Sequence, residues 1–164
     1  MNFLIVTGLS GAGKSMAVNA LEDIGFFCID NIPAGLLPRI LDFAQQGENQ
    51  LSRVAVVMDI RGLHSVQETN EALEALDEKK MPYDILFLDA SDAAIRRRYK
   101  ETRRVHPMTI SEGIPVSEAI TKERQILQPL RERAKYVIDT SLLSTAQNRE
   151  RVSSLFLQKG QCAM

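Results

Sequence analysis

The stretch Gly8-Leu9-Ser10-Gly11-Ala12-Gly13-Lys14-Ser15 decides the fold, because it matches the pattern G-x-x-x-x-G-K-[ST]. It lies between a short apolar run at residues 3–6 and a segment whose apolar residues recur with helical spacing. Its three glycines have no Cβ to keep the backbone away from a phosphate group, so successive N–H groups and a helix N-terminus can converge on one anion. The motif in this strand-to-helix context predicts a phosphate-binding loop.

Two residues of the loop have specific roles in this prediction. Lys14 would place its positive charge between the β- and γ-phosphates of a nucleotide, and the Ser15 hydroxyl would bind Mg²⁺. A glycine-rich turn that binds nothing would leave Lys14 and Ser15 unexplained. A dinucleotide-binding turn is also disfavoured, because the glycine spacing is not G-x-G-x-x-G.

Beyond the loop, short apolar runs typical of buried strands alternate with segments of helical periodicity. The predicted strands cover residues 3–6, 26–29, 54–59, 85–89 and 136–139. Helices are expected around residues 17–24, 36–44, 66–76, 92–105 and 117–135, with a kink near Pro129, and a last helix follows. Gly25 stands where a left-handed residue would end the first helix. The alternation predicts an α/β fold of the kinase-like P-loop NTPase class, a five-stranded parallel sheet with helices on both faces.

Composition excludes several other classes of protein. The 164 residues are 45% hydrophobic and 25% charged, which is typical of one globular domain and not of a disordered chain. With 20 Lys and Arg against 21 Asp and Glu, the net charge of −1 excludes a uniformly basic nucleic-acid binder. Cys28 and Cys162 form no metal-ligand pattern, and no signal peptide or long apolar segment is present, so a cytoplasmic protein without membrane contact is expected.

Three predicted strands end in aspartate, and a parallel sheet brings such ends to the same edge as the phosphate loop. Asp59 follows the third strand, which the kinase-like order places beside the first, and is therefore expected to hold Mg²⁺ together with Ser15. Asp30 ends the second strand, where P-loop kinases hold a base or the phosphoryl acceptor. Asp89, Ser91 or Asp92 is expected to cap the following helix. Lys14, Asp59 and Asp30 are thus the candidate catalytic residues.

A basic cluster follows the fourth strand: residues 96–104 contain six of the 20 basic residues. Three interpretations stay open, namely a lid whose arginines stabilise phosphoryl charge, a surface for RNA phosphates, and a solvated helix face. The candidates for a contact with nucleotide phosphate are Arg97, Arg103 and Arg104. His106, next to Pro107, is interpreted as a structural histidine because it has no catalytic partner in the sequence.

Six segments together resemble one known family, the RapZ/YvcJ nucleotide-binding proteins of bacteria, also called RNase adapter proteins. They are GLSGAGKS at 8–15, FFCIDNIP at 26–33, MDIRG at 58–62, FLDAS at 87–91, YKETRRVHPM at 99–108 and VIDTS at 137–141. The resemblance implies a kinase-like P-loop domain that binds ATP and GTP and hydrolyses them weakly. It assigns residues 8–15 to ATP, and a motif attributed to GTP corresponds to Asp59, Ile60, Arg61 and Gly62.

In some members of that family, the protein binds a small regulatory RNA and presents it to an RNase, mainly through a second, C-terminal domain. The resemblance therefore implies a nucleotide-binding domain over residues 1–158 and the start of a C-terminal domain at residues 159–164.

The leading hypothesis is a regulatory module that binds ATP or GTP with Mg²⁺ and hydrolyses it slowly. A small-molecule kinase that uses Asp30 as a base is the first alternative, and an RNA adapter whose loop only senses nucleotide is the second. The sequence leaves open the choice between ATP and GTP, and it is compatible with a homo-oligomer.

Overall fold

The computed structural model describes residues 2–30, 32, 34–45, 53–58, 66–78, 83–102 and 105–161. At its centre lies a five-stranded sheet with the order β2-β3-β1-β4-β5, in which all neighbouring strands run parallel. The strands are β1 (Asn2–Gly8), β2 (Phe27–Ile29), β3 (Arg53–Val57), β4 (Asp84–Asp89) and β5 (Tyr136–Asp139). This arrangement confirms the predicted parallel sheet, and β3 lies beside β1 as expected.

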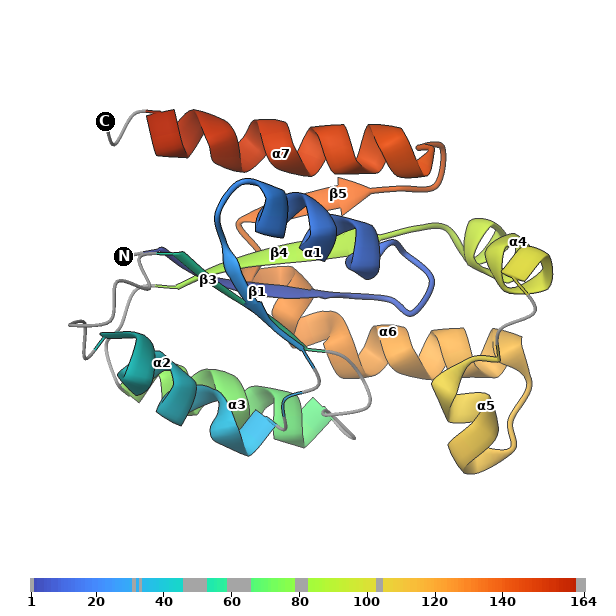
Figure 1. Ribbon diagram of the computed structural model, residues 1–164. Helices are drawn as coiled ribbons and strands as arrows, with labels where there is room; N and C mark the ends of the chain where they lie inside the picture. Colours follow the sequence, from blue (N-terminus) through green and yellow to red (C-terminus); the bar gives the residue numbers. More distant parts are fainter. Residues whose placement is uncertain are drawn as a thin grey trace.

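Helices cover both faces of the sheet, which confirms the predicted layers (Figure 1). α1 (Lys14–Asp23) and α7 (Thr145–Gln161) lie on one face, whereas α2 (Leu37–Gln45), α3 (Val66–Glu78) and α6 (Val116–Arg133) lie on the other. A short 3-10 turn, η1 (Ala34–Leu36), precedes α2. α4 (Asp92–Thr102) and α5 (Pro107–Glu112) lie beyond the end of the sheet where β1 and β4 stop. None of the described helices is long and apolar enough to cross a membrane.

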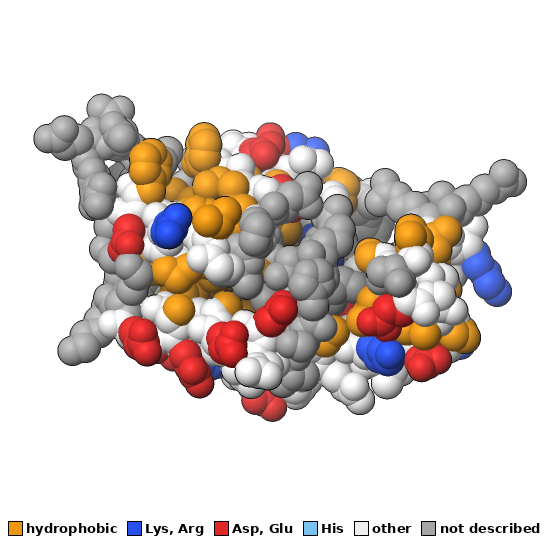
Figure 2. All heavy atoms as spheres, turned by 90° about the horizontal axis from the view of Figure 1, so that it is seen from below, with side chains coloured by type: hydrophobic (Ala, Val, Ile, Leu, Met, Phe, Trp, Pro, Cys, Tyr) orange, Lys and Arg blue, Asp and Glu red, His pale blue; other side chains and the backbone are white. Residues whose placement is uncertain are grey.

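Burial of the central strands on both faces explains their continuous apolar runs. Residues 3–6 of β1 and 85–88 of β4 are all buried. Each such Ile, Leu or Phe side chain stabilises the fold by about 1.5–3 kcal/mol relative to an exposed one. The outer strand β2 is less covered: Phe27 on β2 and Phe43 on α2 are 53% and 57% exposed. Figure 2 shows hydrophobic side chains grouped on the face seen from below.

The ends of two helices follow from local chemistry. Gly25 has φ +99°, and its N–H donates to the Glu22 carbonyl (3.1 Å), which confirms the predicted glycine at the end of α1. The helix α5 was not predicted. It forms because His106 Nδ1 accepts a hydrogen bond from the Met108 N–H (3.1 Å), and Pro107 supplies the backbone angle of a first helical residue. α6 continues through Pro129, and the kink there stays a prediction.

Candidate phosphate-binding site

The loop of residues 9–13 joins the central strand β1 to α1 at the carboxyl edge of the sheet. Its first glycine is required by a close approach to β4. Gly8 has φ +149°, and a Cβ on it would lie 2.2 Å from the Leu88 carbonyl oxygen. The Leu9 N–H donates to that same oxygen (3.2 Å), so the first residue of the loop is hydrogen-bonded to β4.

Three consecutive carbonyl groups of the loop accept hydrogen bonds from other elements. Gly11 O accepts from Arg98 Nη1 (2.9 Å), and Ala12 O accepts from Thr140 Oγ1 (2.7 Å). Gly13 O accepts from Asn148 Nδ2 (3.3 Å) on α7. In a planar trans peptide, the N–H of the next residue points away from the carbonyl. The N–H groups of Gly13 and Lys14 are therefore turned away from these donors, toward the side where an anion can bind.

The N-terminus of α1 adds to this positive potential. Its N-cap residue is Gly13, which has no side chain to satisfy the first helical N–H groups, and these groups carry the partial charge of the helix dipole. Lys14 Nζ donates to the carbonyl oxygens of Gly8 (2.9 Å) and Leu9 (3.0 Å), so the ammonium lies across the first half of the loop. The loop thus combines backbone donors, a helix N-terminus and one cation, as phosphate recognition requires.

The residues present fit Mg²⁺ that is bound together with nucleotide phosphates. Ser15 is exposed in the first turn of α1, where its hydroxyl can reach a cation beside the loop. In the part of the chain that the structure describes, no group of three His, Cys, Asp or Glu side chains could hold a metal by itself. Mg²⁺ in nucleotide sites needs only one or two protein oxygens in addition to phosphate and water.

Several predicted site residues cannot be placed. Asp59, Ile60, Arg61 and Gly62 lie outside the described residues, and their contacts with nucleotide and Mg²⁺ stay predictions. β3 ends at Val57 next to β1, and the Met58 N–H donates to Val6 O (2.9 Å), so the chain reaches residue 59 from the strand beside the loop.

Asp30 is exposed just after β2, the outer strand, so β3 separates it from the strand that carries the loop. Its predicted role as a base stays untested.

The basic cluster contributes Arg98, which the sequence analysis did not single out. Besides Gly11 O, the Arg98 guanidinium donates to Thr140 Oγ1 (3.0 Å) and to the Thr140 carbonyl. Burial, and next the nearby charge of Arg97, lower the pKa of Arg98 from its ordinary value. The helical spacing could have indicated this role, because Arg98 follows the buried Ala94 by one helical turn and so lies on the inner face of α4. Arg97 is exposed and its role stays a prediction; Arg103 and Arg104 lie outside the described residues.

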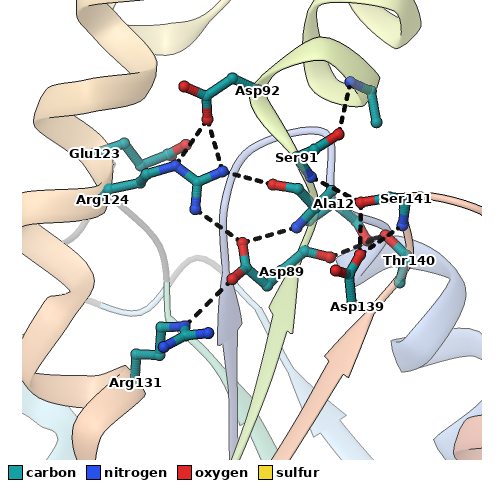
Figure 3. Close-up of polar contacts among 12 residues, drawn as sticks. Ala12, Asp89, Ser91, Asp92, Glu123, Arg124, Arg131, Asp139, Thr140 and Ser141 are labelled. Carbon is teal, nitrogen blue, oxygen red and sulfur yellow. Dashed lines mark hydrogen bonds and ion pairs between the residues drawn. The ribbon is translucent and has the colours of Figure 1, made fainter.

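The expectation that Asp89, Ser91 or Asp92 caps α4 is confirmed. The cap is Ser91, whose Oγ accepts from the Ala94 N–H (3.2 Å). The Asp89 carboxylate instead pairs with two arginines of α6, at 2.9 Å from Arg124 Nη1 and 3.2 Å from Arg131 Nε (Figure 3). This carboxylate is mostly buried at the end of β4, and the arginines came within reach only through the packing of α6. These two ion pairs connect α6 to the carboxyl edge of the sheet.

The turn after β5 is ordered by a second aspartate. Asp139 Oδ1 accepts from the N–H (2.9 Å) and Oγ of Ser141, and these hydrogen bonds hold the pKa of Asp139 below its ordinary value. Ser141 Oγ in turn accepts from the Ser91 N–H (2.8 Å) at the start of α4 (Figure 3). The turn that carries Thr140 is thereby fixed relative to α4.

Residues 1–160 match the family model described as the RapZ-like N-terminal domain. The chain belongs to this family. A relative from Moorella thermoacetica named "Nucleotide-binding protein" is 50% identical to this RapZ-like domain over 157 residues, which are 93% of the chain and 52% of the relative. Another of the same name from Alkaliphilus oremlandii is 43% identical over 161 residues, or 98% of the chain and 55% of the relative. The chain therefore spans about half the length of these relatives.

Solved structures with the same fold include P-loop kinases. Shikimate kinase from Acinetobacter baumannii, in complex with shikimate, superposes with a TM-score of 0.60 at 16% identity, covering 97% of this chain and 94% of that one. The YorR protein from Bacillus subtilis, in complex with phosphorylated GDP, has a TM-score of 0.63 at 14% identity, covering 98% of both chains. At these identities the likeness shows the fold, and it confirms the predicted kinase-like P-loop architecture of the RapZ-like domain.

Proposed function

We propose that this RapZ-like domain binds a nucleoside triphosphate, ATP or GTP, together with Mg²⁺, through residues 8–15. The observation that carries this proposal is the orientation of the loop. Donors from α4, from the turn after β5 and from α7 hold three loop carbonyls outward, so the Gly13 and Lys14 N–H groups point to the opposite side. The relatives named nucleotide-binding protein support the same ligand class.

Slow hydrolysis of the bound nucleotide is the reaction that we propose for this site. Lys14 would neutralise charge on the phosphoryl group, while Ser15 and Asp59 would hold the Mg²⁺ ion. The ion, when bound, would draw charge from the phosphate oxygens and favour attack by water. The resemblance to the RNase adapter proteins favours weak ATPase and GTPase activity over fast turnover.

Calorimetric titration with MgATP and MgGTP tests the binding proposal. Lys14→Ala should weaken the affinity at least tenfold, because a charged hydrogen bond to phosphate contributes about 1.5–3 kcal/mol. Lys135→Ala is the matched control, since Lys135 is exposed at the opposite end of β5 from the turn with Thr140. Equal affinities of wild type and Lys14→Ala would overturn the assignment of the loop. Hydrolysis is then tested by measuring the release of phosphate from bound ATP or GTP. The wild type should release phosphate, and Lys14→Ala should not.

For the whole protein, we propose an adapter role toward a small regulatory RNA and an RNase, mainly through a C-terminal domain that follows residues 1–158. Electrophoretic mobility of an RNA probe with residues 1–164, and with the same region carrying Arg96→Glu and Arg97→Glu, tests the contribution of the basic cluster. Absence of RNA binding by both would assign RNA recognition to the other half of the protein, whereas equal binding by both would assign it to parts of residues 1–164 other than Arg96 and Arg97.

A small-molecule kinase is the second candidate, favoured by the exposed Asp30 at the carboxyl edge of the sheet. The discriminating measurement is transfer of label from γ-labelled ATP. Label that appears in a metabolite would establish a kinase, whereas label only in free phosphate would leave hydrolysis as the reaction.

A further inference from the structure

A buried carboxylate from α6 contacts the phosphate loop directly. Glu123 Oε1 accepts a hydrogen bond from the Ser10 N–H (2.8 Å), and Glu123 Oε2 lies 2.6 Å from Ser10 Oγ. Glu123 is fully buried, although it stands in a strongly polar stretch of sequence. Both hydrogen-bond donors of Ser10 are thus used by one carboxylate.

The second partner of this carboxylate is His106, which is also fully buried, with Nε2 at 3.2 Å from Glu123 Oε1. His106 Nδ1 accepts from the Met108 N–H, so its proton resides on Nε2 and is donated to Glu123. The histidine is therefore neutral in this arrangement. As a carboxylate, Glu123 accepts from all three neighbouring donors, the Ser10 N–H, the Ser10 hydroxyl and His106 Nε2–H, without a proton of its own. Glu123 consequently brings one negative charge to the loop, and no described lysine or arginine forms an ion pair with it.

This charge lies on the side of the loop where the end of a triphosphate would bind. The lysine of this motif reaches the β- and γ-phosphates. Lys14 Nζ lies beside the first half of the loop, at the carbonyls of Gly8 and Leu9, which directly precede Ser10. A terminal phosphate that contacts Lys14 would therefore meet the two donors of Ser10, which Glu123 already occupies.

We propose that Glu123 makes this site discriminate between nucleoside diphosphates and triphosphates. A diphosphate leaves the Ser10–Glu123 contact intact, whereas a third phosphate is repelled by the carboxylate and competes with it for the Ser10 N–H and hydroxyl. Displacement of Glu123 would also change its hydrogen bond to His106, which caps α5, so the state of the nucleotide would be transmitted to α5. This inference rests on the nucleotide binding proposed above.

Glu123→Gln is a sharp test because it removes the charge and can keep every hydrogen bond. The amide oxygen can replace Oε1, which accepts from Ser10 and His106, and the amide nitrogen can donate to Ser10 Oγ. Glu118→Gln is the matched control, since Glu118 is exposed on the same helix and the change in charge is identical.

The measured quantity is the ratio of the Kd for MgATP to the Kd for MgADP, determined by calorimetry, with GTP and GDP as the second pair. Glu123→Gln should lower this ratio roughly tenfold, the effect of one charge within about 10 Å at the effective dielectric of a protein surface. Glu118→Gln should leave it unchanged. A purely structural role of Glu123 would weaken both nucleotides by the same factor and leave the ratio as in wild type.

The outcomes separate the two proposals. Failure of the wild type to bind either nucleotide would overturn the proposed function, whereas binding of both with an unchanged ratio in Glu123→Gln would overturn the role of Glu123 alone. The NMR signals of the Ser10 amide and of His106 Nε2–H in the wild type provide a second measurement that does not depend on the variant's stability. ATP should shift both signals, whereas ADP, which binds the same loop, should shift the Ser10 amide less and leave the His106 Nε2–H signal in place; equal shifts by the two nucleotides would contradict the inference.

Discussion

Thr140 offers a direct test of how the phosphate loop is held. Its side chain is buried, and Oγ1 donates to Ala12 O (2.7 Å) while it accepts from Arg98 Nη1 (3.0 Å). Thr140→Val keeps the shape of the side chain and removes only the hydroxyl. The Ala12 carbonyl then loses its donor, and an unsatisfied buried carbonyl costs about 1–3 kcal/mol. Arg98 keeps its other two acceptors, Gly11 O and Thr140 O, so we expect no larger loss from the arginine.

Thermal unfolding measures this effect. For a domain of this size, 1 kcal/mol corresponds to about 2–4 °C, so Thr140→Val should lower the Tm by roughly 5 °C. Nucleotide affinity should fall as well, because the Ala12 carbonyl and the Gly13 N–H belong to the same peptide plane and rotate together. The affinity loss should be about tenfold, the value of one hydrogen bond that is no longer aligned with phosphate.

The same substitution at an exposed site provides the control. Thr121 lies on the surface of α6, where its hydroxyl donates to Ser117 O in the preceding turn (3.1 Å). Thr121→Val should change the free energy of unfolding by no more than about 0.5 kcal/mol and leave nucleotide affinity unchanged. A Thr140→Val protein with the Tm and the nucleotide affinity of Thr121→Val would refute the view that the loop depends on donors from outside the motif.

Two further predictions concern Gly13 and Cys28. Gly13 has φ +103°, and a Cβ on it would lie 2.5 Å from Asn148 Nδ2, so Gly13→Ala should lower the Tm. Asn148→Ala in the same chain should restore part of the loss. If the effects of the two substitutions on thermal unfolding simply add, this contact is contradicted. Burial, and next the charge of Glu22, raise the pKa of the Cys28 thiol to about 11. In a Cys162→Ser protein at pH 8, folded chains should therefore be alkylated about a hundredfold more slowly than urea-unfolded chains, and equal rates would disprove the shift. The pKa of Cys28 is higher in the folded protein than in the unfolded chain, so the folded protein holds the thiol proton more tightly. The contribution of this proton to the free energy of unfolding is therefore fully present below pH 9 and is lost between about pH 9 and 11.

The strands and the loop could be predicted from the sequence because their signals are local. Apolar runs such as residues 85–88 are typical of strands that are buried on both faces, as in a parallel sheet between two layers of helices. The glycines at 8 and 13 fit backbone angles that other residues adopt with strain. Each of these signals is contained within a few neighbouring positions, so no knowledge of the rest of the chain was needed.

The burial of Glu123 could not be predicted from its neighbours in the sequence. In the sequence it stands between Lys122 and Arg124, and a charged stretch on a helix predicts exposure to solvent. It is buried because its partner Ser10 lies 113 positions earlier in the chain, at the point where α6 passes the loop. The same reason applies to Asp89, one of the three candidate caps of α4: its carboxylate pairs with two arginines of α6, which are distant in the sequence, while Ser91 forms the cap.

The phosphate-loop motif is therefore only part of the phosphate site. Residues 8–15 determine that the backbone can turn tightly, but the direction of its peptide groups is set by Arg98, Thr140 and Asn148, which lie at least 83 positions later. A chain that keeps the motif and loses these donors would keep its glycines and Lys14, yet its N–H groups would no longer be held toward one anion. For that reason Thr140→Val, which leaves the motif intact, is a stricter test of the site than any change within the motif itself.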